Sequence, residues 1–124
     1  MGESLVGAAR NLFQIPGRLP DEEFFEELLN TPSLRVERIV STGQVSPQDF
    51  WYDQEEDEWV ALLQGEAELE FDDGRTLKLQ KGDWAFLPAR ARHRVSFTSA
   101  EPPCIWLAVF APPAERCSSD ALNP

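Results

Sequence analysis

From Leu34 to Phe110 the chain alternates short runs of β-forming residues with turn residues, and no helical apolar period of useful length recurs. Two turn sequences, Asp72-Asp73-Gly74 and Lys81-Gly82-Asp83, indicate antiparallel neighbours. The pattern predicts strands over residues 35–42, 49–52, 58–64, 67–71, 75–79, 83–87, 93–97 and 105–110. Many short, evenly spaced strands favour a sandwich or a closed barrel.

The segment from Pro20 to Leu29 has a different pattern. It starts with proline, continues with carboxylates, and carries apolar residues at i, i+1, i+4 and i+5. These features are typical of a helix, because proline suits the first turn and carboxylates suit the positive end of the helix dipole. Asn30-Thr31-Pro32 then stops the pattern. We therefore expect a short amphipathic α-helix that packs on the body of the protein.

Composition narrows the possible partners. The 124 residues fit one domain with a real core. The formal charge of −11 would repel nucleic-acid phosphates and anionic lipid head groups, so we expect no nucleic-acid and no membrane partner. The chain has no apolar run of the roughly 20 residues that a spanning helix needs, and its first residues lack the features of a secretory signal. A cytoplasmic location is the expectation that follows.

Two motifs carry a family resemblance. Glu58 lies ahead of the turn glycine Gly65, and Gly82 is followed by Pro88 and then His93. This order and spacing resembles the two-motif pattern of the cupin superfamily, and the local sequence is similar to small single-domain bacterial cupins of the cupin 2 type. The resemblance implies an all-β fold, a cupin-type double-stranded β-helix (jelly-roll) barrel, here with the short N-terminal α-helix in front of it.

The same resemblance organises the whole chain as a single cupin domain. Residues 1–34 would form an N-terminal arm with the helix, residues 35–111 the β-barrel, and residues 112–124 a polar C-terminal tail. Cupins commonly pair, so a homodimer is expected.

The site follows from the motif positions. Tyr52 and Gln54 stand where the first motif has histidines, and Arg90 replaces a glycine of the second motif. The resemblance implies a metal set of Gln54, Glu58 and His93, suited to Fe, Mn, Ni or Zn. Strand alternation places the pocket lining on the inward positions. The expected ligand pocket consists of Tyr52, Gln54, Glu58, Arg90, His93 and Phe97.

Several alternatives remain open from the sequence. His93 is either a site residue or a hydrogen-bonded histidine of the barrel. Arg90, Arg92 and Arg94 either form an anion-binding rim or form salt bridges with the acidic loop, and the second interpretation is favoured. The protein is expected to bind a small molecule, with a weak divalent-metal site used for isomerase-type or oxygenase-type chemistry. The alternative is a non-enzymatic, metal-free binding or sensing module.

Overall fold

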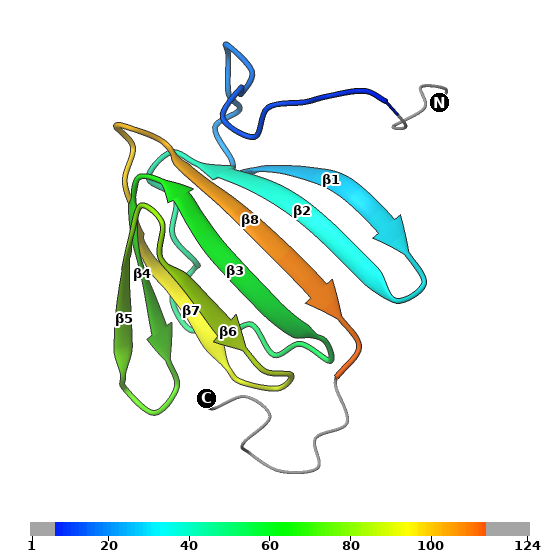
Figure 1. Cartoon of the computed structure of the whole chain (residues 1–124). Coiled ribbons are helices and arrows are strands. Elements are labelled where there is room, and N and C mark those ends of the chain that lie inside the picture. The colour runs from blue at the N-terminus through cyan, green and yellow to red at the C-terminus, as the bar shows by residue number, and fades with distance from the viewer. Residues whose placement is uncertain (1–6, 114–124) are drawn as a thin grey trace.

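The computed structural model describes residues 7–113, and its regular elements there are all β-strands (Figure 1). No helix in this range has the length and apolar character needed to cross a membrane. The strands are β1 (Phe24–Thr31), β2 (Leu34–Ser41), β3 (Asp57–Gln64), β4 (Glu66–Phe71), β5 (Thr76–Gln80), β6 (Trp84–Leu87), β7 (His93–Thr98) and β8 (Cys104–Ala111).

These strands form two antiparallel sheets. One has five strands in the order β1-β2-β8-β3-β6, and the other has three in the order β5-β4-β7. The sheets face each other as the two layers of a jelly roll (Figure 1). The predicted all-β barrel is therefore confirmed, because alternating apolar positions on both sheets are buried between them.

The predicted N-terminal helix is wrong. The segment instead forms β1, which pairs with β2 from Phe24↔Val40 to Thr31↔Leu34. The doublets Phe-Phe, Glu-Glu and Leu-Leu fit a helical period, but a helix of ten residues is marginal by itself. A short turn joins this segment to β2, and pairing with a strand that is itself held by β8 overrides the local preference.

The other predicted strands are found with ends shifted by at most one residue, except for residues 49–52. That stretch is a loop, and only Tyr52 pairs, in an isolated bridge with His93. The two predicted turns are present. Gly74 and Gly82 both have positive φ, 92° and 93°, which glycine adopts without strain.

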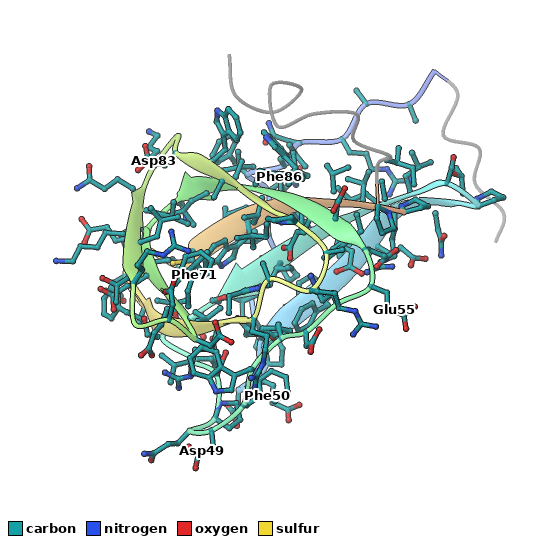
Figure 2. All side chains as sticks on the ribbon, turned by 90° about the horizontal axis from the view of Figure 1, so that it is seen from below. Asp49, Phe50, Glu55, Phe71, Asp83 and Phe86 are labelled. Carbon is teal, nitrogen blue, oxygen red and sulfur yellow. The ribbon has the colours of Figure 1, made fainter. Side chains whose placement is uncertain are left out.

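The core fills the space between the sheets. Figure 2 looks along the barrel and shows side chains from both sheets in its interior, with the loop that carries Phe50 and Glu55 along the rim. Each fully buried large apolar side chain contributes about 1.5–3 kcal/mol. The buried cluster comprises Val60, Leu62, Ala67, Leu69, Leu79, Leu87, Cys104, Trp106, Ala108 and Phe110.

Candidate functional site

The core is incomplete near the start of β3 and β7, where a cavity of about 180 Å³ opens between the sheets. Its walls are mostly apolar, and its polar groups come from β2, β3, β7, the segment before β1 and the loop before β3. The lining residues are Glu23, Phe25, Arg35, Glu37, Ile39, Tyr52, Gln54, Glu58, Val60, Leu69, Leu87, His93, Val95, Trp106 and Phe110.

His93 is the first residue of β7, and hydrogen bonds hold both its backbone and its imidazole ring. The Tyr52 N–H donates to the His93 carbonyl over 2.7 Å, and the His93 N–H donates to the Tyr52 carbonyl over 3.2 Å. The imidazole Nδ1 lies 2.8 Å from the Ala91 carbonyl oxygen. A carbonyl only accepts, so Nδ1 carries the hydrogen and Nε2 of the neutral ring has a free lone pair.

Burial lowers the pKa of His93, while the hydrogen bond to the Ala91 carbonyl opposes the shift. The Tyr52 ring stacks on the imidazole with the ring centroids 5.4 Å apart and an angle of 24° between the planes. The cavity therefore contains a neutral imidazole in a defined orientation.

Glu58 lies on β3 and faces His93. Its side chain is only 10% exposed, and its Oε1 lies 3.9 Å from His93 Nε2, beyond hydrogen-bond distance. Gln54 donates from Nε2 to the same carboxylate oxygen over 3.1 Å. The two ionisable groups are thus close enough to contact one ligand group together.

Burial raises the pKa of Glu58 to about 7, against the opposing effect of the Gln54 hydrogen bond. Glu37 and Glu56 raise this pKa further, and Arg35 lowers it. Near neutral pH the Glu58 carboxyl therefore exists in both protonated and ionised forms, which suits it to donate or accept a proton.

The phenol of Tyr52 lies in a buried environment close to carboxylates. Burial, together with the charges of Glu23 and Glu58, raises the pKa of its phenol. Its hydroxyl therefore stays protonated, and it lines the cavity as a neutral polar group.

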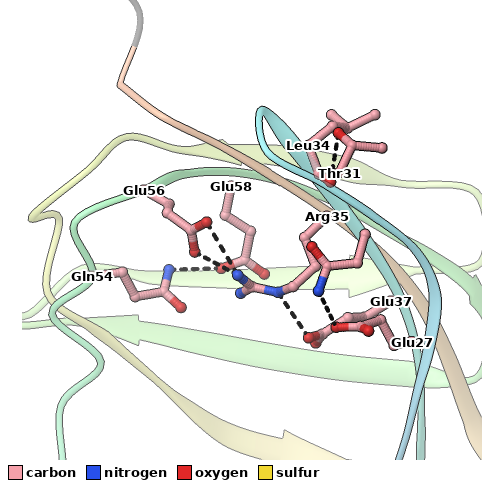
Figure 3. A network of polar contacts seen from close by, with 9 residues as sticks. Glu27, Thr31, Leu34, Arg35, Glu37, Gln54, Glu56 and Glu58 are labelled. Carbon is pink, nitrogen blue, oxygen red and sulfur yellow. Dashed lines mark hydrogen bonds and ion pairs between the residues drawn. The ribbon is translucent and has the colours of Figure 1, made fainter.

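Arg35 forms a network of polar contacts beside Glu58 (Figure 3). Its Nε donates to Glu37 over 3.0 Å, and one terminal nitrogen donates to both Glu56 oxygens over 2.9 and 3.1 Å. Its guanidinium lies 4.2 Å above the centre of the Phe110 ring. Burial alone would lower the pKa of Arg35, but the bonds to Glu37 and Glu56 raise it. Arg35 is therefore neutralised by two carboxylates.

The lining residues missed from the sequence include Glu23, Phe25, Arg35 and Glu37. Glu23 and Phe25 belong to the segment that was expected to be helical. Arg35 and Glu37 lie two residues apart on a predicted strand, and so on one face. That alternation was a signal for a polar pair, but nothing in the sequence showed which face is inward.

Two expected pocket residues lie outside the cavity. The pairing of β4 with β7 shifts between Leu69↔Val95 and Glu68↔Phe97, so Ser96 is an extra residue that forms a bulge. Val95 then faces the cavity, whereas Phe97 turns outward and is 48% exposed. The expectation of Phe97 as a pocket residue is corrected by this bulge.

Arg90 also points away from the cavity. Its side chain is 62% exposed and pairs with Asp53 at 3.1 Å and with Glu55 at 3.8 Å. Its φ is 70°, a conformation natural to the glycine that the family motif has at this position. Arg90 therefore preserves the turn of the motif without contributing to the pocket.

The other two arginines of the group also form ion pairs. Arg92 lies 3.6 Å from Asp72, and Arg94 lies 2.9 Å from Glu70. All three arginines thus form ion pairs, as the favoured interpretation expected, but only Arg90 pairs with the acidic loop. The partners of Arg92 and Arg94 belong to the turn after β4 and to β4.

The expected metal set does not fit a firmly held metal. Within residues 7–113 no group of three or more His, Cys, Asp or Glu side chains converges as metal ligands. Glu58 and His93 supply two donors, and the Gln54 amide nitrogen is already bonded to Glu58. A catalytic metal site usually has three protein ligands.

Comparison with known proteins agrees with this architecture. The profile of the cupin domain family matches residues 37–110, more than half of the chain. No curated protein matches the chain. One similar solved structure is a Ralstonia eutropha JMP134 protein, provisionally named a mannose-6-phosphate isomerase. It is 40% identical, with a TM-score of 0.80, over 85% of this chain and 98% of that one.

More distant structures share the fold alone. An RmlC-like cupin from Desulfovibrio desulfuricans is 20% identical with a TM-score of 0.65, over 86% of this chain and 98% of that one. KdgF from a Halomonas species is 22% identical with a TM-score of 0.61, over 75% of this chain and 81% of that one.

Proposed function

The chain belongs to the cupin domain family, and on this premise we propose that its barrel cavity binds a small organic molecule through Glu58 and His93 without a metal ion. One observation carries the proposal: a buried carboxyl and an oriented, unprotonated imidazole nitrogen face each other 3.9 Å apart at an apolar cavity. Few convergent polar groups in an apolar cavity are typical of small-molecule sites.

The size of the cavity limits the ligand. An apolar cavity of about 150 Å³ accommodates benzene. The cavity here is about 180 Å³ and is open to solvent on one side. It therefore suits a molecule of one six-membered ring, or a chain of similar bulk, with substituents that extend to the opening.

Nuclear magnetic resonance offers a direct test, because His93 is the single histidine of the chain. A panel of sugars, organic acids and amines should include compounds that shift the imidazole signals and raise the unfolding temperature. Both effects should weaken in Glu58→Gln. Glu27→Gln, an exposed carboxylate change on β1, is the matched control. If the compounds that raise the unfolding temperature leave the His93 signals unchanged, they bind elsewhere and the proposal fails.

A second candidate function is isomerisation by proton transfer. It is favoured by the pKa of Glu58, about 7, and by the unprotonated Nε2 of His93, which together can remove and return a proton at neutral pH. The relative with 40% identity is provisionally named an isomerase. Glu58 would take the proton from the hydroxyl-bearing carbon beside a carbonyl and return it to the carbonyl carbon. The hydroxyl proton would move to the former carbonyl oxygen, so the carbonyl group changes place and no atom is gained or lost.

Deuterium exchange distinguishes this candidate from simple binding. Mannose and mannose 6-phosphate are incubated with the protein in heavy water. Enzymatic proton transfer should place deuterium on the carbon beside the carbonyl, and Glu58→Gln should reduce the rate by about 10²-fold or more. A wild-type rate equal to that of buffer would leave a binding module.

A further inference from the structure

The charges around the cavity are unbalanced. Its lining holds three carboxylates, of Glu23, Glu37 and Glu58, but a single guanidinium, that of Arg35. Arg35 is already bound to Glu37 and, outside the lining, to Glu56. Among the described residues, Glu23 and Glu58 form no ion pair with a lysine or arginine, and the cavity lining has more carboxyl groups than cationic groups.

Glu23 is held in place by neutral donors. The Ser41 hydroxyl donates to its carboxylate over 2.6 Å, and Trp106 Nε1 donates to the Ser41 oxygen over 3.1 Å. Ser41 is fully buried, and Trp106 is 4% exposed. This series of hydrogen bonds holds the Glu23 carboxylate at the cavity through neutral donors. The carboxylate can therefore still pair with a cationic ligand group.

His93 adds a further acceptor. Its side chain is 6% exposed, and its Nε2 lone pair faces Glu58 from beyond hydrogen-bond distance. The Ala91 carbonyl accepts the hydrogen bond of Nδ1, so Nε2 is the acceptor of the ring. A ligand group that donates several hydrogen bonds could bind His93 Nε2 and the Glu58 carboxylate together. An anionic ligand group would instead face acceptor atoms and be repelled.

Aromatic rings complete the environment. Phe25, Tyr52, Trp106 and Phe110 line the cavity. The Phe110 ring already has a cation against its face, since the Arg35 guanidinium lies 4.2 Å from its centre. Phe25 is 56% exposed although it lines the cavity, so its ring lies near the opening. Aromatic ring faces attract ammonium groups, and carboxylates accept charge-assisted hydrogen bonds from them.

We propose that the ligand of this cavity is a small organic cation, an amine of about one ring in size, whose ammonium group binds the carboxylates of Glu23 and Glu58. The inference rests on the proposed binding function and specifies its ligand class. It also predicts that a phosphorylated sugar, the substrate class in the name of the Ralstonia relative, is disfavoured here.

The test uses molecules of equal size and different charge. Benzylamine, benzyl alcohol and benzoate are titrated into the full-length protein, with mannose 6-phosphate as the phosphorylated probe. Binding is followed by calorimetry and by the His93 imidazole signals. Benzylamine should bind about tenfold or more tightly than benzyl alcohol, because a charge-assisted hydrogen bond is much stronger than a neutral one. Benzoate and mannose 6-phosphate should bind weakest.

Variants assign the preference to the carboxylates. Glu23→Gln and Glu58→Gln should each reduce the ratio of benzylamine to benzyl alcohol affinity by several-fold, while Glu27→Gln leaves it unchanged. Added salt should weaken benzylamine binding more than benzyl alcohol binding. Circular dichroism of each variant separates a lost fold from a lost preference.

The outcomes separate the two proposals. Equal affinity for amine and alcohol, or tighter binding of benzoate or mannose 6-phosphate at the His93 signals, overturns the cation inference and leaves the binding function intact. An amine preference that survives both cavity substitutions also overturns it. If none of the four probes, nor any member of the broader panel, perturbs His93, the binding function itself is contradicted.

Discussion

At the residue scale, Glu58 is a carboxyl group placed where ionisation is costly. Its side chain is buried, and its hydrogen-bond donor is the neutral amide of Gln54. Arg35 helps the ionised form only indirectly, since it is bound to Glu37 and Glu56. Such a group destabilises the fold at neutral pH, which is a common property of functional residues.

The first prediction concerns the pH dependence of stability. The pKa of Glu58 rises from 4.5 to about 7 on folding, so the folded state holds a proton that the unfolded state has lost. Stability from this group is full below pH 4.5 and is lost as the pH rises to about 7. Glu58→Gln removes the effect. Over that pH range, the free energy of unfolding of wild type should fall by up to about 3 kcal/mol relative to that of the variant.

Urea unfolding at a series of pH values measures this difference. Glu27→Gln serves as the control, because Glu27 is exposed on β1. Parallel pH profiles for wild type and Glu58→Gln would contradict the assignment.

The second prediction concerns His93. Burial lowers its pKa below the ordinary 6.5, so the folded state binds a proton less readily than the unfolded state. Stability from this group is present above pH 6.5 and is lost as the pH falls below it. Titration of the imidazole signals should show a pKa below 6.5 and, in the neutral form, the hydrogen on Nδ1. A pKa above 6.5 would contradict this prediction and would mean that attraction to the Glu58 carboxylate outweighs burial.

At the scale of elements, the sequence pattern predicted most strands from β2 onward but predicted a helix where β1 forms. The pattern of residues 20–29 satisfies a helix, but from Phe24 onward β2 pairs with this segment, with one register shift between Glu27 and Leu29. The bulge at Ser96 was equally hidden, since one extra residue leaves no mark in the alternation and yet turns Phe97 outward. Local sequence does not contain the register of a partner strand.

The site was predictable where motif spacing determines backbone position. Glu58 and His93 face one another as the spacing implied, and Gln54 and Tyr52 join them. Glu23 was not predictable, because its place depends on the Ser41 hydroxyl from a strand 18 residues later. Motif spacing thus located one side of the cavity, and strand pairing supplied the other.

The third prediction compares two turn glycines. Gly65 and Gly74 both have φ of 92°, so alanine at either should cost about 1–2 kcal/mol. At Gly65 an added Cβ would lie 2.9 Å from the Cys104 Cα and 2.8 Å from Ser99 Oγ, whereas at Gly74 it would meet nothing within 4 Å. Gly65→Ala should lower the free energy of unfolding, measured with urea, by about 1–3 kcal/mol more than Gly74→Ala does. Equal losses would show that β3 and β8 can separate there without cost.

At the scale of the whole molecule, the barrel is retained while the metal chemistry of its motifs is reduced. Tyr52 and Gln54 occupy the histidine positions of the first motif, and each has found another role. Tyr52 stacks on His93, and Gln54 binds Glu58. The expected homodimer stays a prediction, and light scattering would measure it. The proposal of metal-free binding is compatible with a cupin fold, because function depends on the site rather than the fold.

The last prediction tests that conclusion by restoring ligands. Wild type incubated with Fe, Mn, Ni or Zn and then desalted should retain well under one metal per chain, because Glu58 and His93 are one strong donor short. Gln54→His places an imidazole where an amide now lies 3.1 Å from Glu58, and Tyr52→His adds a fourth donor. The double variant should retain close to one Zn or Ni, and His93→Ala in that background should remove it. Elemental analysis gives the ratio of metal to protein. Loss of the metal when Glu58→Gln is added to the double variant would show that the carboxylate is a ligand. A stoichiometric metal in wild type that disappears in His93→Ala would instead show that two donors and an amide suffice, and the metal-free proposal would be wrong.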